Sequence, residues 1–378
     1  MKLESWEREP LWLKIITPWL KKKRLPRLEG KPKSETWYRI YLEGCTAADG
    51  EETYADFYQG TENRLLIFFN GGGVSWNAYT AARPASLYDK DYKNSFYTVR
   101  MDLFSDLNLS RGILENSDRN PFRNWSKLVL IYNTGDFHCG TGDFPYIAKD
   151  GSHRVCRHHG YTNFRKAIEH VKDLIPSPES LMVSGCSGGA FGAALLTDDV
   201  MEIYPDCDEV TCLVDSGFFP LKNAPDIAKN VWKTPKKIVD RLHTDNLTLD
   251  ALQALSRNHP GKVNILVCCS VRDAALSRMS NMTINNVFAF SEESGAWFQK
   301  WLSGTMDKIK STIPNAGIYI FDIPDNQEAK SYHLTIHCII GDRHLYQNRT
   351  EGKTCMEWIR DAVRGQITSY GLSLLGVK

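Results

Sequence analysis

Six short, nearly uninterrupted apolar runs constrain the fold of this 378-residue chain more than any other feature. A strand that is apolar along its whole length is typical of a parallel sheet covered by helices on both faces. Helical patterns at about 161–174 and 188–200 separate some of the runs, and this alternation predicts an α/β fold with a mostly parallel central sheet flanked by helices. The runs span residues 64–70, 127–133, 180–185, 210–217, 262–270 and 317–323.

Two aromatic-rich segments precede these runs. Residues 37–44 and 53–60 flank a turn that ends in Asp49-Gly50, and this arrangement predicts an N-terminal β-hairpin. We therefore expect residues 1–35 to form an N-terminal extension and residues 36–378 to form a single domain.

Two longer helical segments, at about 220–258 and 274–315, lie between predicted strands. Insertions at these places either form a cap over a site at the sheet edge or are crossover helices of extra length. The sequence leaves both interpretations open.

Composition limits the classes of partner. The formal net charge is +1, whereas a nucleic-acid-binding domain is typically basic, so we expect no nucleic-acid partner. No stretch approaches the roughly 18 apolar residues of a membrane-spanning helix, so no stable membrane insertion is expected. Residues 11–24 are apolar and then basic, but Pro18 interrupts the pattern, which favours a docked segment and a solvated turn over a membrane-surface helix.

The ten cysteines follow no repeated spacing, and several lie in the apolar runs. Buried, reduced thiols are typical of cytoplasmic proteins, and the N-terminus lacks the pattern of a secretory signal. The sequence therefore predicts a cytoplasmic protein. Paired C-x-x-C units are absent, so neither a zinc site nor any other cofactor is predicted.

One serine has the context of a catalytic nucleophile. Gly185-Cys186-Ser187-Gly188-Gly189 matches G-x-S-x-G, with an apolar strand before it and a small-residue helix after it. The glycines are needed because the serine occupies a sharp, strained turn in which side chains two positions away would collide. Ser187 is the predicted nucleophile. Ser184 lies within the strand end, and Cys186 should point away from the site.

A glycine-rich turn follows the first apolar run. In hydrolases of this kind such a turn supplies backbone N–H groups that stabilise a developing oxyanion. The predicted donors are the amides of Gly72, Gly73 and Gly188. The lysine of a phosphate-binding P-loop is missing here.

Chain order then suggests an acid and a base. The order in this class is Ser, Asp or Glu, then His. Asp215 and Asp273 both follow apolar strands, and Asp273 suits the acid because it comes from the later strand. His337 is the predicted base, with His333 as the second choice.

Ordered sequence blocks over roughly 65–345 resemble the pectin acetylesterase and Notum-like carboxylesterase family, and look closest to its bacterial branch. The resemblance implies an α/β-hydrolase-like fold and metal-free ester hydrolysis. It places the nucleophile at Ser187, the acid at Asp273 and the base at His337. The blocks are NGGG (70–73), YNTGDFHCGTGD (132–143), HHGYTN (158–163), SGCSGG (184–189), VDSGFF (214–219), RDAALS (272–277) and the His337-Cys338 segment.

Four further residues are predicted to bind substrate: Asp136, His138, Asp215 and Trp76. Asp215 either lines the pocket or holds a loop, and Asp136 and His138 are expected at the pocket edge. With Asp143 they make an Asp/His cluster, but defined metal-ligand spacing is lacking.

The predicted function is a serine carboxylic ester hydrolase that removes a small acyl group, such as acetyl, from a carbohydrate or similar alcohol. Two alternatives remain: an esterase or thioesterase for longer acyl chains, and a binding module without catalysis.

Overall fold

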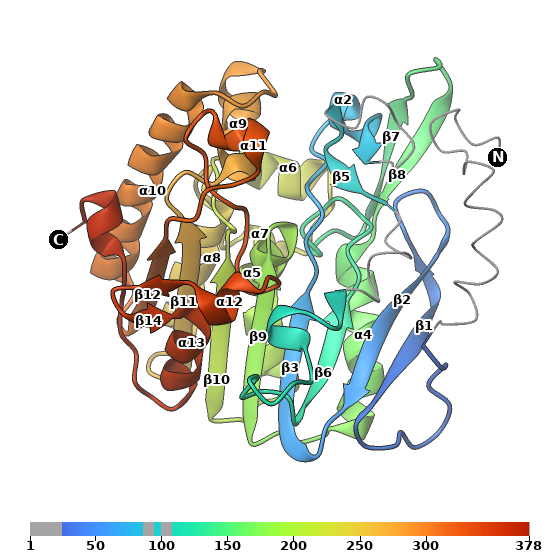
Figure 1. Cartoon of the computed structure of the whole chain (residues 1–378). Coiled ribbons are helices and arrows are strands. Elements are labelled where there is room, and N and C mark those ends of the chain that lie inside the picture. The colour runs from blue at the N-terminus through green and yellow to red at the C-terminus, as the bar shows by residue number, and fades with distance from the viewer. Residues whose placement is uncertain (1–24, 86–93, 100–107, 378) are drawn as a thin grey trace.

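A mostly parallel eight-stranded sheet forms the centre of the molecule. The computed structural model describes residues 25–85, 94–99 and 108–377, so most of the predicted N-terminal extension lies outside the described residues. The strand order is β1-β2-β6-β3-β9-β10-β11-β12 (Figure 1). All pairs from β6 to β12 are parallel, which confirms the predicted α/β fold.

Each apolar run forms a parallel strand. Every residue of β6 is buried, and the other parallel strands are mostly buried, because helices cover both faces. The largest difference is that the 127–133 run leaves the sheet after Leu130. The strands are β3 (Glu62–Phe69), β6 (Trp125–Leu130), β9 (Ser180–Cys186), β10 (Glu209–Asp215), β11 (Val263–Ser270) and β12 (Ala316–Phe321).

The predicted N-terminal hairpin is confirmed and extends this sheet. It consists of β1 (Thr36–Thr46) and β2 (Glu52–Gln59), which pair antiparallel. β2 then pairs antiparallel with β6, so the hairpin closes one side of the sheet. A second hairpin, β7 (Gly142–Ile147) and β8 (His153–His158), stands apart as its own two-stranded sheet.

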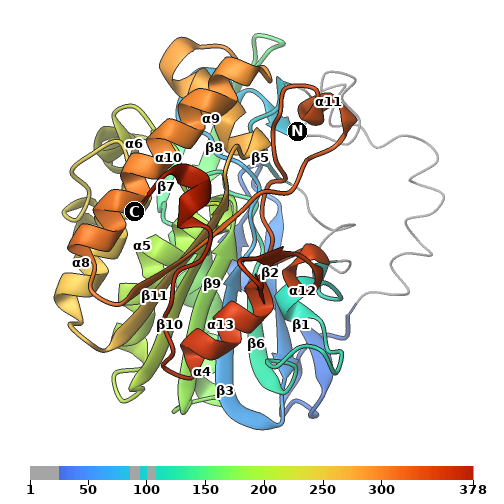
Figure 2. The same ribbon diagram turned by 60° about the vertical axis from the view of Figure 1, so that its left-hand side comes forward.

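Helices cover both faces of the sheet. One face is covered by α4 (Gly160–Leu174), α5 (Gly188–Ile203), α8 (Leu247–Asn258) and α10 (Glu292–Thr312), whose apolar residues belong to one large core. The opposite face is covered by α12 (His344–Gln347) and α13 (Cys355–Val363), which pack on a second core. Figure 2 shows α13 on one side of the strands and α8 and α10 on the other.

The two helical insertions are mainly crossover helices. The segment 220–258 forms α6 (Ala224–Asn230), α7 (Lys236–Val239) and α8, and the buried leucines of α8 belong to the core. The segment 274–315 forms α9 (Ala274–Asn285) and α10, of which α10 packs along the same face. α9 rises beyond the sheet edge at the top of Figure 1.

The remaining short elements lie mostly around the edges of the sheet. No helix among the described residues is long and apolar enough to cross a membrane. The short elements are α2 (Ala78–Ala81), β4 (Pro84–Ala85), β5 (Tyr97–Thr98), α11 (Gln327–Lys330), β13 (Arg349–Thr350), β14 (Lys353–Thr354) and two 3₁₀ turns, 112–114 and 372–375.

Candidate active site

Ser187 lies in the strained turn that the sequence predicts. It is the first residue after β9 and the residue before α5, with φ 55° and ψ −128°. A Cβ on Gly185 would come within 2.1 Å of the Gly189 carbonyl oxygen, and a Cβ on Gly189 within 1.9 Å of the Phe69 carbonyl oxygen. Only glycine fits at these two positions, so the local packing explains the G-x-S-x-G pattern.

The glycine turn after β3 packs directly against this elbow. A Cβ on Gly71 would lie 2.6 Å from Cβ of Ser187, and one on Gly188 would lie 3.4 Å from the Gly72 nitrogen. Gly73 has φ 77°, which favours glycine, and a Cβ there would meet the Phe96 carbonyl oxygen at 2.0 Å. The predicted oxyanion donors therefore lie beside Ser187, two on the turn and one on the helix.

A tyrosine fixes the position of the glycine turn. The Tyr132 hydroxyl donates to the Gly73 carbonyl at 2.7 Å and accepts from the Phe137 N–H at 3.1 Å. Tyr132 is fully buried, and burial is the largest cause that raises its pKa well above the ordinary value, so the hydroxyl stays protonated. The glycine turn is thus held by a donor that does not titrate in the physiological range.

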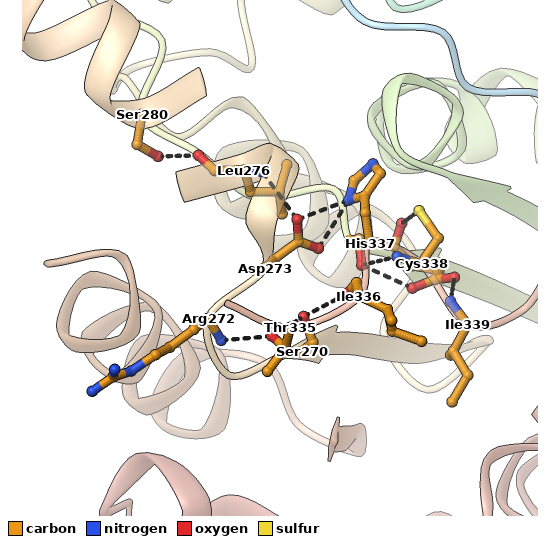
Figure 3. Close-up of polar contacts among 12 residues, drawn as sticks. Ser270, Arg272, Asp273, Leu276, Ser280, Thr335, Ile336, His337, Cys338 and Ile339 are labelled. Carbon is orange, nitrogen blue, oxygen red and sulfur yellow. Dashed lines mark hydrogen bonds and ion pairs between the residues drawn. The ribbon is translucent and has the colours of Figure 1, made fainter. Parts of the chain in front are cut away.

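Asp273 and His337 face each other at the same edge (Figure 3). The Nδ1 atom of His337 lies 2.9 Å from each carboxylate oxygen of Asp273. A carboxylate only accepts hydrogen bonds, so Nδ1 is the protonated nitrogen and Nε2 is left as an acceptor. Asp273 is fully buried, whereas the His337 side chain keeps 23% of its surface exposed.

The electrostatics of His337 suit a base. Burial lowers the pKa of His337, but the charge and hydrogen bonds of Asp273 raise it more, so the net pKa lies above the ordinary 6.5. Asp215 adds to the rise through its charge. A basic Nε2 is the property that a proton acceptor needs.

Backbone contacts hold the acid and the base in register. Asp273 and Thr335 form an isolated parallel bridge, and Ala274 N–H donates to the Thr335 carbonyl at 3.0 Å. The Thr335 hydroxyl accepts from Arg272 N–H at 3.1 Å and donates to the Ser270 hydroxyl at 2.8 Å. The segment that bears His337 is thereby fixed to the end of β11 next to Asp273, as Figure 3 shows.

Asp215 joins the serine turn to the histidine loop. Its carbonyl accepts from Ser187 N–H at 3.0 Å, and its Oδ2 accepts from the N–H groups of Ile339 and Ile340 at 2.7 and 2.9 Å. Burial raises the pKa of Asp215, and these backbone donors oppose the rise. Asp215 is fully buried, and within the described part of the chain its carboxylate accepts hydrogen bonds from Ser216, Ile339 and Ile340 but not from His337, so of the two sequence-based roles the geometry favours holding a loop.

Asp136 and His138 lie beneath the site and not on its surface. Both are buried, with 0% and 2% exposure, which disagrees with the expectation that they contact substrate. His138 Nε2 donates to the Asn70 carbonyl at 2.9 Å, and burial lowers the pKa of His138 to about 4, so the ring is neutral. The Asp136 carboxylate accepts from N–H groups of Gly140 and Gly160. These polar residues of a glycine-rich loop therefore form hydrogen bonds with buried backbone groups and not with substrate.

The other candidates have diverse environments. Trp76 is half-buried and packs edge-on against Phe96, with ring centroids 5.5 Å apart, close to the glycine turn. Asp143 is exposed and pairs with His159, whereas Asp136 is buried. His333, the second choice for the base, is exposed and approaches Glu292 instead of Asp273. Among the described residues no group of His, Cys, Asp or Glu is arranged to hold a metal ion.

The arrangement offers a nucleophile, a base with a fixed tautomer and a set of backbone donors. No hydrogen bond between the Ser187 hydroxyl and His337 occurs among those of the described residues, and such bonds often tighten only when substrate binds. The serine turn and the histidine loop are both anchored to the end of β10: Ser187 N–H donates to the Asp215 carbonyl, and Cys338 N–H donates to the Ser216 hydroxyl. This chemistry suits acyl transfer from an ester.

Sequence reasoning missed two contributors to the site. Tyr132 is the first residue of the YNTGDFHCGTGD block, but no motif assigns it a role. Its hydroxyl donates to a carbonyl of the glycine turn, which is far away in the sequence. Ser216 follows Asp215 with φ 54°, and its hydroxyl holds the Cys338 N–H. A strained serine next to a strand-end aspartate has no sequence signature, so only the fold identifies it.

Comparison with known proteins agrees with these features. The family model described as Pectinacetylesterase matches residues 43–262, more than half of the chain. The match includes Ser187 and ends before Asp273 and His337. Among curated proteins, Pectin acetylesterase 11 from Arabidopsis thaliana is 26% identical over 183 residues, 47% of this chain. The aligned part is only 43% of that relative's length.

Among solved structures, two crystal forms of the Wnt deacylase Notum from Drosophila are similar. Their TM-scores are 0.57 and 0.60 at 14% and 15% identity. The alignments cover 86% of this chain and 92% and 93% of the Notum chains. At such low identity the likeness concerns the fold. The family model, which spans the glycine turn and the serine elbow, shows that this chain belongs to the pectinacetylesterase family.

Proposed function

We propose that this protein is a serine carboxylic ester hydrolase that removes a small acyl group from a carbohydrate or similar alcohol. The observation that supports this best is the pairing of a strained Ser187 elbow with a His337–Asp273 dyad at the same sheet edge. Family membership supports the same reaction class.

In the proposed reaction Ser187 Oγ attacks the ester carbonyl carbon while His337 Nε2 accepts its proton. The carbonyl oxygen becomes an anion, which the N–H groups of Gly72, Gly73 and Gly188 stabilise. The C–O bond to the alcohol then breaks, and His337 returns the proton to the leaving oxygen. Water attacks the acyl-enzyme in a second, equivalent cycle.

Asp273 has two tasks in this scheme. It holds the proton of His337 on Nδ1, so that Nε2 is free to accept, and it stabilises the imidazolium that forms. It does not take up the proton itself.

Labelling with a fluorophosphonate probe tests the reaction class. We expect wild type to be labelled stoichiometrically and Ser187→Ala not at all, because the probe forms a covalent bond to an activated serine. Ser184→Ala serves as the control, since the Ser184 hydroxyl is buried in β9. Absence of labelling in folded wild type would instead support a binding module without catalysis.

A small acyl group on a carbohydrate is favoured by the name of the curated relative, a pectin acetylesterase. A second candidate, a longer acyl chain, is favoured by aromatic residues beside the glycine turn. Phe96 packs on Phe288 from the α9–α10 loop with ring centroids 4.6 Å apart, and Tyr79 packs on Phe96 at 5.8 Å. This cluster adjoins the glycine turn, since a Cβ on Gly73 would meet the Phe96 carbonyl oxygen at 2.0 Å.

A chain-length series of p-nitrophenyl esters separates these candidates. For the small-acyl enzyme we expect kcat/KM to be greatest for acetate and to fall as the chain grows. Phe288→Ala should then leave acetate hydrolysis little changed and improve longer esters. A maximum beyond about eight carbons would establish the long-chain candidate instead, because each buried CH₂ contributes roughly 0.8 kcal/mol.

The state of the thiols bears on where the protein works. All ten cysteines are free, and eight of them are buried. Free thiols support the proposal that the protein functions in a reducing compartment such as the cytoplasm. Labelling of the purified native protein with a thiol reagent, before and after denaturation, tests this by counting the free thiols.

A further inference from the structure

Two cysteines differ from the rest. Of the ten free cysteines, Cys186 and Cys338 are the two that are partly exposed; the other eight are buried. Cys186 directly precedes Ser187, and Cys338 directly follows His337. These two cysteines therefore flank the proposed nucleophile and the proposed base, although 151 residues lie between them in the sequence.

The sheet places these two side chains on the same side. Cys186 is the register partner of Asp215 in the parallel pair of β9 and β10, and paired residues in a pleated sheet point to the same face. The Asp215 carboxylate on that face binds the Ile339 and Ile340 N–H groups, so the loop after His337 lies over it. The Cys338 thiol is 3.9 Å from the Asp215 carbonyl oxygen.

The same carbonyl oxygen also accepts from Ser187 N–H at 3.0 Å. One peptide group of β10 is thus in contact with the residue that follows Cys186 and with the sulfur of Cys338. Cys186 and Ile336 both pack against the same apolar cluster, so the two turns lie over the same face of the sheet.

The two thiols also influence each other. A hydrogen bond with the Cys338 thiol is the largest cause that lowers the pKa of Cys186, and it outweighs the rise from burial. A lower pKa favours the thiolate, which is the form that oxidants attack. By contrast, burial raises the pKa of Cys212 to about 12, which is typical of an inert core thiol.

We propose that Cys186 and Cys338 are a modification site at which a peroxide forms a reversible disulfide across the active site. The Cys186 thiolate attacks hydrogen peroxide, giving a sulfenic acid and releasing one water molecule after protonation. The Cys338 thiol then attacks that sulfur, the S–O bond breaks, and a second water leaves. The two thiols lose two electrons and two protons in total, and the peroxide is reduced to two waters.

The disulfide lowers activity because it moves both turns. A disulfide brings the sulfurs to about 2.05 Å, far closer than two unbonded thiols. Ser187 at φ 55° and Cys338 at φ 64° already have strained backbones, so the turns have little freedom to absorb the movement. A misplacement of about 1 Å in a catalytic site can cost about 100-fold in rate. Only this effect on activity rests on the proposed function; the disulfide itself does not.

The experiment treats the reduced full-length protein with hydrogen peroxide and follows two readouts. Proteolysis and mass spectrometry under non-reducing conditions should give a Cys186–Cys338 cross-linked peptide. Hydrolysis of p-nitrophenyl acetate should fall by about tenfold to a hundredfold and return after dithiothreitol. If the protein proves to have no esterase activity, the cross-linked peptide still decides the disulfide independently of the proposed function.

Variants make the outcome specific. Cys338→Ser and Cys338→Ala should each abolish the cross-link and the dithiothreitol-reversible loss. Cys207→Ser is the matched control, because Cys207 precedes β10 at the opposite end of the strand from Asp215, and it should respond like wild type. Cys268 and Cys355, fully buried, report on unfolding: their cross-linking would mean that peroxide had opened the core. A reversible loss that persists in Cys338→Ser, or no cross-link in folded wild type, overturns the proposal.

Discussion

His337 donates from Nδ1 to both carboxylate oxygens of Asp273 at 2.9 Å, so one residue fixes both the orientation and the tautomer of the other. Asp273 has a second task as well. Its Oδ1 accepts from the Leu276 N–H at 2.9 Å and thereby caps α9. Catalytic and structural roles meet in one side chain, and substitutions can separate them.

Asp273→Asn should remove most activity while keeping the fold. Asparagine is as good an N-cap as aspartate, so its oxygen can still accept from Leu276 N–H. Its amide then donates towards His337 Nδ1, which forces the proton onto Nε2 and leaves no acceptor for the Ser187 proton. We expect kcat to fall on the order of 10⁴-fold with little change in melting temperature. Steady-state hydrolysis and thermal unfolding measure the two effects.

Asp273→Ala is the control for the cap. It should lose the same activity and, in addition, about 1 kcal/mol of stability. If Asp273→Asn stays within tenfold of wild type, Asp273 is not the acid.

The pH dependence of activity follows from the same pair. His337 must be neutral to accept a proton, and Asp273 raises the pKa of His337 above the ordinary 6.5. Activity should therefore be full above the raised pKa and fall as the pH drops through it, so the acid limb of kcat/KM should have its midpoint above 6.5.

In Asp273→Asn burial still lowers the pKa of His337, and only weaker interactions raise it. The acid limb of the residual activity should therefore have its midpoint at lower pH than in wild type. Measuring kcat/KM for p-nitrophenyl acetate as a function of pH in both proteins provides the comparison. An unchanged midpoint in the variant would mean that another group controls the limb.

Asp215 should act on stability more than on chemistry. Asp215→Ala leaves the N–H groups of Ile339 and Ile340 without their acceptor, and each buried, unpaired group costs about 1–3 kcal/mol. Asp215→Asn keeps one oxygen for these donors, so its loss should be smaller. Urea unfolding gives both values, and kcat of Asp215→Asn should stay far above that of Asp273→Asn. The reverse ranking, with unaltered stability, would make Asp215 the acid.

Sequence patterns predicted much of the site because its main parts are local. The Ser187 elbow needs glycine at fixed offsets, and the parallel strands need uninterrupted apolar runs, so both are visible in a few consecutive residues. Chain order admitted both Asp215 and Asp273, and the later strand and the family resemblance favoured Asp273; exposure in the fold separates His337 from His333.

What the sequence did not reveal depends on contacts between distant segments. Asp215 ends a strand as a catalytic acid would, and its role as a clamp exists only because residues 339–340 fold back onto it. Asp136 and His138 have the polarity of substrate contacts, yet they pair with buried backbone groups. Residue type alone does not reveal whether such a side chain is structural or binds substrate, nor which group it contacts.

Tyr132 offers a test of how firmly the glycine turn must be held. Tyr132→Phe removes the bond to the Gly73 carbonyl and leaves the Phe137 N–H without its acceptor. The turn gains freedom, so its N–H groups are less well aimed at the developing oxyanion. We expect kcat to fall about tenfold, equivalent to about 1.4 kcal/mol of transition-state stabilisation, with a smaller change in KM.

The matched control is Tyr204→Phe. The Tyr204 hydroxyl is buried and has no hydrogen-bond partner within the described part of the chain, so its removal costs no bond. Tyr204→Phe should keep wild-type kcat and equal or exceed wild-type stability, because burying an unpaired hydroxyl is itself unfavourable. Steady-state kinetics and thermal unfolding of both variants give the comparison. If Tyr132→Phe loses stability but retains kcat, Tyr132 supports the fold only, and the glycine turn keeps its alignment by packing against the Ser187 elbow.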